Sequence, residues 1–585
     1  MTETFAVKLE EKCYLPDPRC KAAAWTPDYT RAYQEFMHDP EAFWDQVAHE
    51  LDWFKPWDRV LEWNYPYAKW FVNGKLNITY NCLDRHVTSD RRDKPAVIWR
   101  GEGGEERRLT YDGLYREVMR CANALAGLGV GKGDRVCIYM PLVPEQIVAR
   151  RACARLGAVH SVVFGGFGAG ALAMRINDAE AKVVITADVG YRRGKTIPLR
   201  DIVNEALTHA PCVEKTVVFR RGTPAVDLDP AREVDYADLV ARAAPDCPAE
   251  VMDAEDPLFI LYTSGSTGAP KGIVHTCGGY MVGTYYTSRH DFDIKESDIL
   301  WCTADPGWIT GHSYIVYGPL AVGTTVVIAE GTPDYPDPGA YWRLVQDLGV
   351  TIFYTAPTAI RMFMRHGDAW PAKYDLSTLR VLGSVGEPLN PEAFEWYYHR
   401  IGGGECPVVD TWWQTETGMH VVTTMIGEAM KPGFAGRAIP GAVVDVVDRT
   451  GKPVPPGTGG FLVIREPWPA MLRTVHGNDA RYRTYWETIP GCYTAGDLAV
   501  KDEDGYIMIL GRADDLIVVA GHNIGTAEVE SALVSHDAVA EAAVIGKPDA
   551  LKGNVIKAFV TLRVGKNPGD GLTDELARHV KKSLG

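Results

Sequence analysis

A glycine-rich stretch near the middle of the chain, YTSGSTGAPKG at residues 262–272, is the feature that most constrains how this chain can fold. It follows an apolar run at 257–261, which indicates a buried strand. The glycines free the backbone to curl, and the serine and threonine hydroxyls add short hydrogen-bond donors. Such a loop can turn several N–H groups towards phosphate oxygens, and Lys271 adds a positive charge. We therefore predict a phosphate-binding loop.

Two alternatives to this prediction are a Walker P-loop and a plain linker. The Walker P-loop is excluded, because its two glycines and Lys-Ser/Thr end have a different spacing. A plain Gly/Ser linker is the other alternative. Linkers rarely leave a buried strand and end in Pro-Lys-Gly, so phosphate binding is the favoured interpretation. The candidate phosphate contacts are Thr263, Ser264, Gly265, Ser266, Thr267, Gly268 and Lys271.

The composition indicates a globular protein of more than one domain. A chain of 585 residues exceeds a typical single domain, and 46% hydrophobic with 23% charged residues excludes a disordered chain. The 61 basic and 76 acidic residues give a net charge of −15. Nucleic acids and anionic membranes repel that charge, so neither is expected as a partner. A local basic pocket for a nucleotide stays compatible with it.

The cysteines and the first residues indicate a cytoplasmic protein. Twelve cysteines are scattered from Cys13 to Cys492 with no CxxC pair, which favours reduced thiols over a zinc site or a disulfide framework. The first residues lack the basic and apolar pattern of a signal peptide. No uncharged apolar run is long enough to span a bilayer.

Alternating strand and helix patterns predict an α/β fold. Strands are expected at 96–99 and 135–139, and helices at 110–128 and 145–156. Such alternation predicts parallel-rich sheets with helices on both faces. Further strands are expected at 159–164, 182–186, 216–219, 324–329, 351–354 and 379–382.

We predict three parts around this pattern. Residues 1–90, rich in tryptophan and tyrosine, are expected to form an arm whose aromatic rings pack on a large domain at 91–513. Plain packing is favoured there over an aromatic ligand site. A small β subdomain is expected at about 432–510, and a small mobile α+β domain at 514–585. The expected elements are strands at 441–447, 460–464, 506–510, 516–519, 541–545 and 555–562, and helices at 526–534 and from Leu572.

Seven motifs resemble those of the AMP-forming acyl-CoA synthetases of the adenylate-forming superfamily. The chain is most similar to the acetyl-CoA synthetases among them, and the resemblance covers essentially its whole length. Luciferases and peptide-synthetase adenylation domains fit less well, because the aromatic arm and the run around Trp413 match the short-acid branch. The motifs are YTSGSTGAPKGIVHT (262–276), GWITGHSY (307–314), YTAPTAIR (354–361), GSVGEPLN (383–390), DTWWQTETG (410–418), YTAGDLAVKDEDGYIMILGRADD (493–515) and GHNIGTAEVESAL (521–533).

The resemblance implies a ligase that uses ATP, Mg²⁺ and CoA. In the family an acid attacks the ATP α-phosphate, giving acyl-AMP and pyrophosphate. The small domain then swings, and the CoA thiolate takes the acyl group and releases AMP. Charge neutralisation and alignment suit this chemistry better than covalent catalysis. The implied catalytic residues are Lys271, Thr267, Glu416 and the hinge Asp514.

The resemblance also assigns an ATP site. Glu416 is the implied Mg²⁺ ligand, because a hard cation prefers carboxylate oxygen. Asp497 is the implied ribose carboxylate, and Arg512 its cationic neighbour; an Asx turn and a surface ion pair are the plain alternatives. The remaining implied contacts are Gly386, Glu387, Pro388, Asp410, Thr411, Trp412, Trp413, Gln414, Thr415 and Asn523.

An acyl pocket and a CoA site complete the assignment. Trp413 closes the acyl pocket in the family, and an ordinary core indole is an equal alternative. The basic run at 192–195 matches a CoA phosphate contact, with a solvated charge run as the alternative. The implied acyl-pocket residues are Ile309, Thr310, Val385 and Trp413. The implied CoA residues are Phe164, Gly165, Gly166, Arg192, Arg193, Gly194, Lys195, Thr310, Asp334, Ala520, Gly521 and Lys581. A second cation is implied at Val534, His536 and Val539, where a structural histidine is the alternative.

The chain departs from the family pattern at several positions. Ala520, Asn523 and Asp334 stand where the family has Ser, Arg and often Asn, which changes the expected CoA and ATP contacts. The family continues to a Pro-Lys-Thr-x-Ser-Gly-Lys segment that the printed chain, ending at Gly585, does not reach. We expect a truncated chain; the alternative is a protein without the adenylation lysine. A ligase for propionate or another short acid, and an impaired nucleotide- or CoA-binding relative, remain competing functions, and the oligomeric state stays open.

Overall fold

The computed structural model describes the chain apart from residues 1–4, 7–11, 224–225, 264–269, 514–516, 520–521, 525, 550–552, 564–565, 570 and 585. The side chains of 5–6, 517–519, 522–524, 527–528, 548–549, 553–554 and 583–584 also lie outside the description. Within the described residues, no helix has the length and apolar character needed to cross a bilayer.

The large domain contains a nine-stranded sheet. Its inner strands are parallel and its edges antiparallel, and β19, β20 and β21 are buried along their whole length. Continuous Val- and Ile-rich runs suit strands that are covered on both faces. In spatial order the strands are β23 (Arg437–Ala438), β22 (Val422–Thr423), β21 (Val408–Trp412), β20 (Val381–Val385), β19 (Ile352–Thr355), β17 (Ile299–Cys302), β18 (Thr325–Ala329), β5 (Pro95–Arg100) and β6 (Glu106–Thr110).

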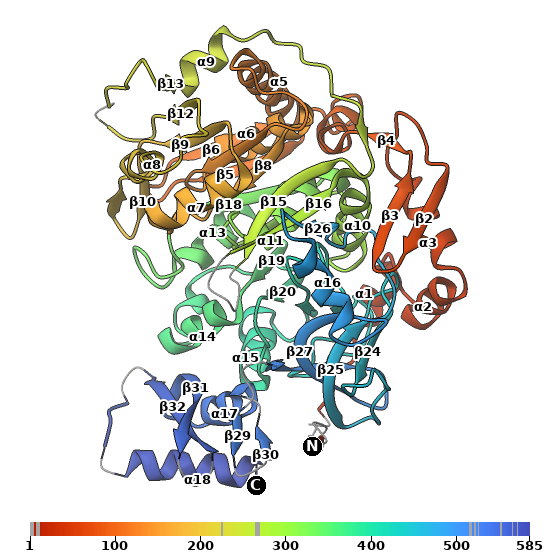
Figure 1. Cartoon of the computed structure of the whole chain (residues 1–585). Coiled ribbons are helices and arrows are strands. Elements are labelled where there is room, and N and C mark those ends of the chain that lie inside the picture. Colours follow the sequence, from red (N-terminus) through yellow and green to blue (C-terminus); the bar gives the residue numbers. More distant parts are fainter. Residues whose placement is uncertain are drawn as a thin grey trace.

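An eight-stranded sheet carries the glycine-rich stretch. Helix α6 (Pro144–Arg155) connects two of its adjacent parallel strands, as the alternation predicts, and α5 (Tyr111–Gly127) leads into it from the last strand of the nine-stranded sheet. The α/β fold class is confirmed (Figure 1). The strand order is β13 (Glu233–Asp235), β12 (Lys215–Phe219), β9 (Val183–Ala187), β7 (Arg135–Tyr139), β8 (Val159–Val162), β15 (Pro257–Thr263), β16 (Lys271–Thr276) and β26 (Thr474–Val475).

Strands from the predicted β-subdomain region join three different sheets. A five-stranded sheet contains β1 (Phe5–Ala6), β24 (Val444–Val447), β25 (Thr458–Ile464), β27 (Tyr493–Lys501) and β28 (Ile507–Arg512). However, β23 extends the nine-stranded sheet, and β26 pairs with β16 in the eight-stranded sheet. Turn-rich sequence identified short strands but not their partners, because pairing is set by distant segments.

The aromatic arm packs on the large domain. Its helix α2 (Tyr29–His38) packs on α3 (Pro40–Ala48), and β2 (Arg59–Asn64) pairs with β3 (Tyr67–Val72). Of these elements, α3 and β3 contact α10 (Cys277–His290) of the large domain, and Figure 1 shows β3 next to α10. The Trp44 ring meets Tyr286 of α10 edge-on, with 5.5 Å between ring centroids. Packing is therefore the observed role of this ring.

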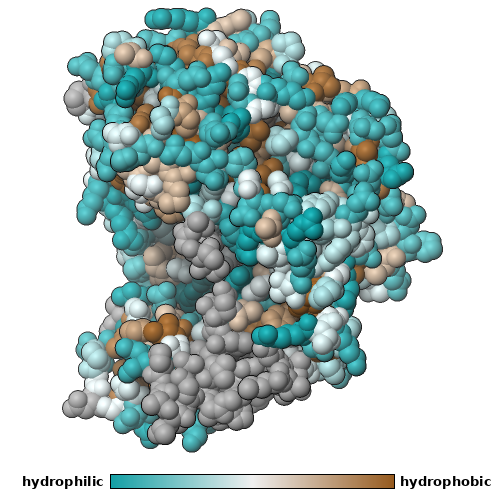
Figure 2. Space-filling view, viewed as in Figure 1, coloured by the Kyte–Doolittle hydropathy of each residue, from teal (hydrophilic) through white to brown (hydrophobic). Residues whose placement is uncertain are grey.

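A small α+β unit follows the large domain. It contains β29 (Ile517–Val519), β30 (His522–Ile524), α17 (Thr526–Val534), β31 (Val539–Asp549), β32 (Gly553–Leu562) and α18 (Leu572–Leu584). Helix α17 contacts β28, and β31 contacts α14 (Pro357–His366). Figure 2 shows the left surface hollowed between this unit and the large body.

Candidate active site

The predicted phosphate loop closes a hairpin between two adjacent strands. Ser264, Gly265, Ser266, Thr267 and Gly268 lie outside the described residues. Directly flanking them, Thr263 at the end of β15 pairs with Lys271 at the start of antiparallel β16. Strand β16 was not expected from the sequence, because Gly272 and His275 interrupt its apolar pattern.

Lys271 and Glu416 lie together at the start of β16. The Lys271 Nζ is 3.6 Å from Glu416 Oε1, and it lies 3.2 Å from the Tyr485 hydroxyl. That hydroxyl donates a 2.6 Å hydrogen bond to Glu416 Oε1. Burial lowers the pKa of Lys271, although Glu416 opposes the shift. Tyr485 comes from α16 (Asp479–Glu487), and no motif in the sequence could have identified it.

Glu416 fits the implied Mg²⁺ ligand. Within the described residues, no group of three His, Cys, Asp or Glu side chains could enclose a metal ion. Mg²⁺ commonly binds one or two carboxylates and completes its coordination with phosphate oxygens and water. A single buried carboxylate beside Lys271 is therefore a suitable donor set.

Asp497 is a further predicted site residue, and three side chains hold its carboxylate. Its Oδ2 accepts hydrogen bonds from Trp412 Nε1 at 3.0 Å and Gln414 Nε2 at 2.8 Å. Its Oδ1 accepts one from Arg512 Nη1 at 3.2 Å, because the β27–β28 register pairs Asp497 with Arg512. Burial raises the pKa of Asp497, and the Arg512 charge opposes that shift. A carboxylate offers about four acceptor positions, so these bonds leave room for one further donor.

The two segments expected at the adenine lie on neighbouring strands. Parallel pairing places Ser384 beside Asp410 and Val385 beside Thr411. Gly386 has φ +94°, a left-handed conformation that favours glycine. Burial raises the pKa of Asp410 to about 7. Glu387, in contrast, is engaged at the rim by Arg361 and Thr358.

The predicted acyl-pocket residues are all buried. Ile309, Val385 and Trp413 belong to one apolar core, and Thr310 follows Ile309 in the one-turn helix α11 (Ile309–Gly311). The Trp413 ring meets Tyr314 edge-on, with 5.1 Å between centroids. The indole is thus packed in the core, and the assignment of these four residues to one acyl pocket stays a prediction.

The basic run forms an exposed hairpin. Strands β10 (Gly190–Arg192) and β11 (Lys195–Ile197) pair Arg192 with Lys195 across a turn in which Arg193 and Gly194 have positive φ. Arg193 Nη2 lies 2.9 Å from Asp334 Oδ2, so two CoA candidates neutralise each other. Glu102 accepts both turn amides at 2.7 Å.

The other described CoA candidates, aromatic and cationic, do not all lie together. The Phe164 ring lies 5.6 Å from the Trp308 ring, which is 47% exposed. Trp308 was missed as a candidate, although it lies in the GWITGHSY motif. Lys581 is exposed on α18, which Figure 1 places at the opposite end of the molecule from β10. The structure therefore does not bring Lys581 to the basic hairpin.

The carbonyls of the predicted second cation site are engaged within the protein. His536 O accepts the Val539 amide at 2.9 Å, and Val539 O accepts Arg563 Nε at 3.0 Å. Because a guanidinium already contacts Val539 O, these contacts disfavour a metal ion there. Val534 is buried just before this turn. Asp514, Ala520, Gly521 and the side chain of Asn523 lie outside the described residues.

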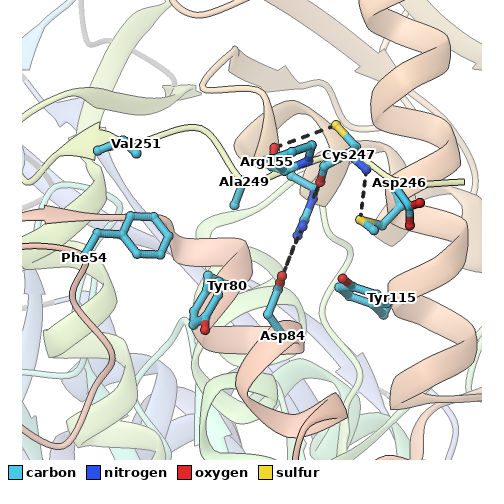
Figure 3. A pocket seen from close by; sticks show the side chains of 11 residues that line it. Phe54, Tyr80, Asp84, Tyr115, Arg155, Asp246, Cys247, Ala249 and Val251 are labelled. Carbon is cyan, nitrogen blue, oxygen red and sulfur yellow. Dashed lines mark hydrogen bonds and ion pairs between the residues drawn. The ribbon is translucent and has the colours of Figure 1, made fainter. Parts of the chain in front are cut away.

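A surface groove of about 490 Å³ lies elsewhere, between the arm and α5 (Figure 3). Phe54, Tyr80 and Tyr115 line it, and the Arg155–Asp84 ion pair at 2.8 Å lies among them. No predicted site residue borders this groove.

Family models and known proteins match most of this chain. The model of the AMP-binding enzyme family matches residues 83–472, that of the acetyl-coenzyme A synthetase N-terminus matches 29–82, and that of the AMP-binding enzyme C-terminal domain matches 528–585. The acetyl-coenzyme A synthetase of Deinococcus radiodurans is 55% identical over 561 residues, covering 95% of this chain and 86% of that protein. The one from Chlorobaculum tepidum is 50% identical over 590 residues, covering 100% and 90%.

A solved structure shares the fold. The acetoacetyl-CoA synthetase from Streptomyces lividans superposes with a TM-score of 0.88 at 26% sequence identity, covering 97% of this chain and 89% of that one. The predicted resemblance is thus confirmed across the chain. This chain belongs to the AMP-binding enzyme family, among the acetyl-coenzyme A synthetases.

Proposed function

We propose that this chain is an AMP-forming acetate–CoA ligase. It activates acetate with ATP to acetyl-AMP and pyrophosphate, and then transfers the acetyl group to CoA, releasing AMP. The observation that carries the proposal is the convergence of Lys271, Glu416 and Asp497 beside the glycine-rich hairpin. The Glu416 charge acts on Asp497, and the Arg512 charge acts on Lys271, so these groups share one electrostatic site.

The arrangement suits attack on a polyphosphate. Lys271 reduces the negative charge that the acetate carboxylate meets as its oxygen bonds to the α-phosphorus. The bond from that phosphorus to pyrophosphate breaks, and the electron pair leaves with pyrophosphate. Glu416 would hold Mg²⁺, which would supply further charge neutralisation. In the second step the CoA thiolate bonds to the acyl carbon, and AMP leaves with the electrons of the acyl–oxygen bond.

Acetate is the preferred acid, because the tryptophan that Trp413 matches leaves room for a two- or three-carbon acid in the family. The β-branched side chains of Ile309, Thr310 and Val385 fit a tight pocket. One methylene is worth about 1–3 kcal/mol in such a pocket, so propionate is disfavoured but not excluded. Trp413→Gly should move the preference to longer acids. Unchanged chain-length preference in a folded variant would contradict the pocket assignment.

The test of the function is AMP release with ATP, CoA and a series of acids. We expect acetate to exceed propionate by about tenfold or more in kcat/KM. Equal rates with propionate would favour the broader short-acid ligase. Tight ATP binding without AMP release from any acid would favour a nucleotide-binding relative instead.

We further propose that its substrates are small molecules, without nucleic acid or membrane partners, and that it works in the cytoplasm. The net charge of −15 supports the first statement. Twelve cysteines that are all free of disulfides support the second.

A further inference from the structure

We infer that Tyr354, backed by His420 and Asp291, is a positioning residue that holds the Trp413 indole and so sets the depth of the acyl pocket. Tyr354 opens the YTAPTAIR motif, to which the function described above gives no role. The inference rests on the proposed function, because it refines which acid the site accepts.

The Tyr354 hydroxyl is the centre of a buried cluster. Trp413 Nε1 donates to Tyr354 Oη at 3.3 Å. The same oxygen lies 3.1 Å from His420 Nε2 and 2.7 Å from Thr411 Oγ1. On the other side of its ring, His420 Nδ1 lies 3.1 Å from Asp291 Oδ2. Tyr354, His420 and Asp291 have no exposed surface, so water cannot replace these bonds.

Aromatic rings hold the indole from a second direction. Tyr314 stacks on His420 with 3.9 Å between centroids and 22° between planes. Trp413 meets Tyr314 and His420 edge-on, at interplanar angles of 89° and 71°. The Tyr314 hydroxyl accepts the His420 amide at 2.8 Å, which ties this stack to the backbone. The indole plane is thus held by rings and its N–H by Tyr354.

The hydrogen-bond directions follow from donor counting. Thr411 Oγ1 donates to Ser384 O at 2.7 Å, so Tyr354 must supply the hydrogen between Tyr354 and Thr411. His420 Nε2 then donates to Tyr354. With His420 and Asp291 both uncharged, His420 Nδ1 accepts from the Asp291 carboxyl. Tyr354 Oη therefore accepts two bonds and donates one, which uses its full capacity.

Burial is consistent with this uncharged arrangement. It raises the pKa of Asp291 well above its usual value and lowers the pKa of His420 well below its own. When the hydrogen-bonded side chains of this cluster are all uncharged, no ion attracts water into the wall of the pocket. Removing the Tyr354 hydroxyl would leave the Trp413 and His420 N–H groups without an acceptor among the described residues. The indole would then be free to tilt, and the pocket would deepen.

The experiment compares Tyr354→Phe with Tyr397→Phe. Tyr397 is a matched control, because it is equally buried and its hydroxyl donates to Phe353 O at 3.1 Å, behind the same sheet but without contact to Trp413. Kinetic constants for acetate, propionate and butyrate, and KM for ATP, are measured for both variants. Their melting temperatures show whether each variant is folded.

We expect Tyr354→Phe to raise KM for acetate and to lower the acetate-over-propionate ratio of kcat/KM by about tenfold, with KM for ATP unchanged. Tyr397→Phe should keep the wild-type ratio. His420→Gln retains a donor towards Tyr354 and should keep most of the selectivity, whereas His420→Leu should lose it.

A folded Tyr354→Phe variant with the wild-type acid preference would overturn the inference. If that variant does not fold, an unchanged preference in His420→Leu would do the same. If Trp413→Gly shifts the preference and Tyr354→Phe does not, the acyl pocket stands and only the positioning role fails. Absence of AMP release by the wild type with every acid would overturn the proposed function itself, and this inference with it.

Discussion

The ammonium group of Lys271 lies 3.6 Å from a carboxylate oxygen of Glu416, across two segments that are 145 residues apart in the sequence. The Tyr485 hydroxyl contacts both groups and keeps them close. This contact joins strand β16 to the DTWWQTETG motif, which begins within β21. A cation, an anion and a hydroxyl therefore meet where a polyphosphate chain with its metal ion would lie.

Glu416→Gln should abolish most of the adenylation activity. The amide keeps the shape and the bond from Tyr485 but cannot hold a hard cation, so we expect a loss of about 100-fold or more in ATP- and acetate-dependent AMP formation. Acetyl transfer from supplied acetyl-AMP to CoA should fall much less. Asp502→Asn is the matched control. Asp502 forms a similarly buried ion pair with Lys431, with 2.6 Å between Nζ and Oδ2, and this pair lies away from the site. Retention of half the wild-type rate by Glu416→Gln would contradict the assignment.

Asp334→Asn should tighten CoA binding. The substitution releases the exposed Arg193 guanidinium for a phosphate, and surface pairs of this kind are worth about 0.2–1 kcal/mol. We expect KM for CoA to fall up to about fivefold. Dephospho-CoA, which lacks the 3′-phosphate, should show no change. Asp337→Asn disrupts a nearby pair with Arg343 and serves as the control. An equal change in KM for CoA and for dephospho-CoA would exclude a role of Arg193 at the 3′-phosphate.

Asp410→Asn should remove a pH dependence of stability. Burial raises the pKa of Asp410 from 3.8 to about 7, so between these values the folded state binds more protons than the unfolded state. Stability therefore falls as pH rises from about 4 to about 7 and is constant above. At 1.36 kcal/mol per pKa unit, the cost at pH 8 is roughly 4 kcal/mol. Melting temperatures at pH 5, 7 and 8 should show Asp410→Asn gaining on the wild type as pH rises; a constant difference would refute the shift.

Trp44→Ala should loosen the aromatic arm. Trp44 is 1% exposed, and truncating a buried tryptophan costs about 3–5 kcal/mol. We expect a lower urea midpoint and faster proteolysis between the arm and the large domain. Trp63→Ala is the control, because Trp63 is 40% exposed and surface changes usually stay within about 0.5 kcal/mol. Equal effects of the two substitutions would show that the arm is not held by this ring.

Much of the local structure could be predicted from the sequence. The strand Arg135–Tyr139 and the helix Thr526–Val534 were located with their observed bounds, and the final helix begins at Leu572 as expected. These elements follow from short-range signals: apolar periodicity, caps and turn residues. The motif residues of the site could be identified for the same reason, because each motif is a continuous segment.

Only the tertiary structure determined which side chains meet. Tyr485 at Glu416, Asp334 at Arg193 and His420 at Tyr354 join segments far apart in the chain, and none of these pairs has a local signature. The antiparallel pairing of β26 with β16 was likewise absent from the pattern. The sequence by itself determined the elements, the family motifs and the class of chemistry, because these depend on neighbouring residues. Packing between distant segments decided which charges meet, which hydrogen bonds form and which side chains line a pocket. Burial and partner geometry exist only in the folded chain.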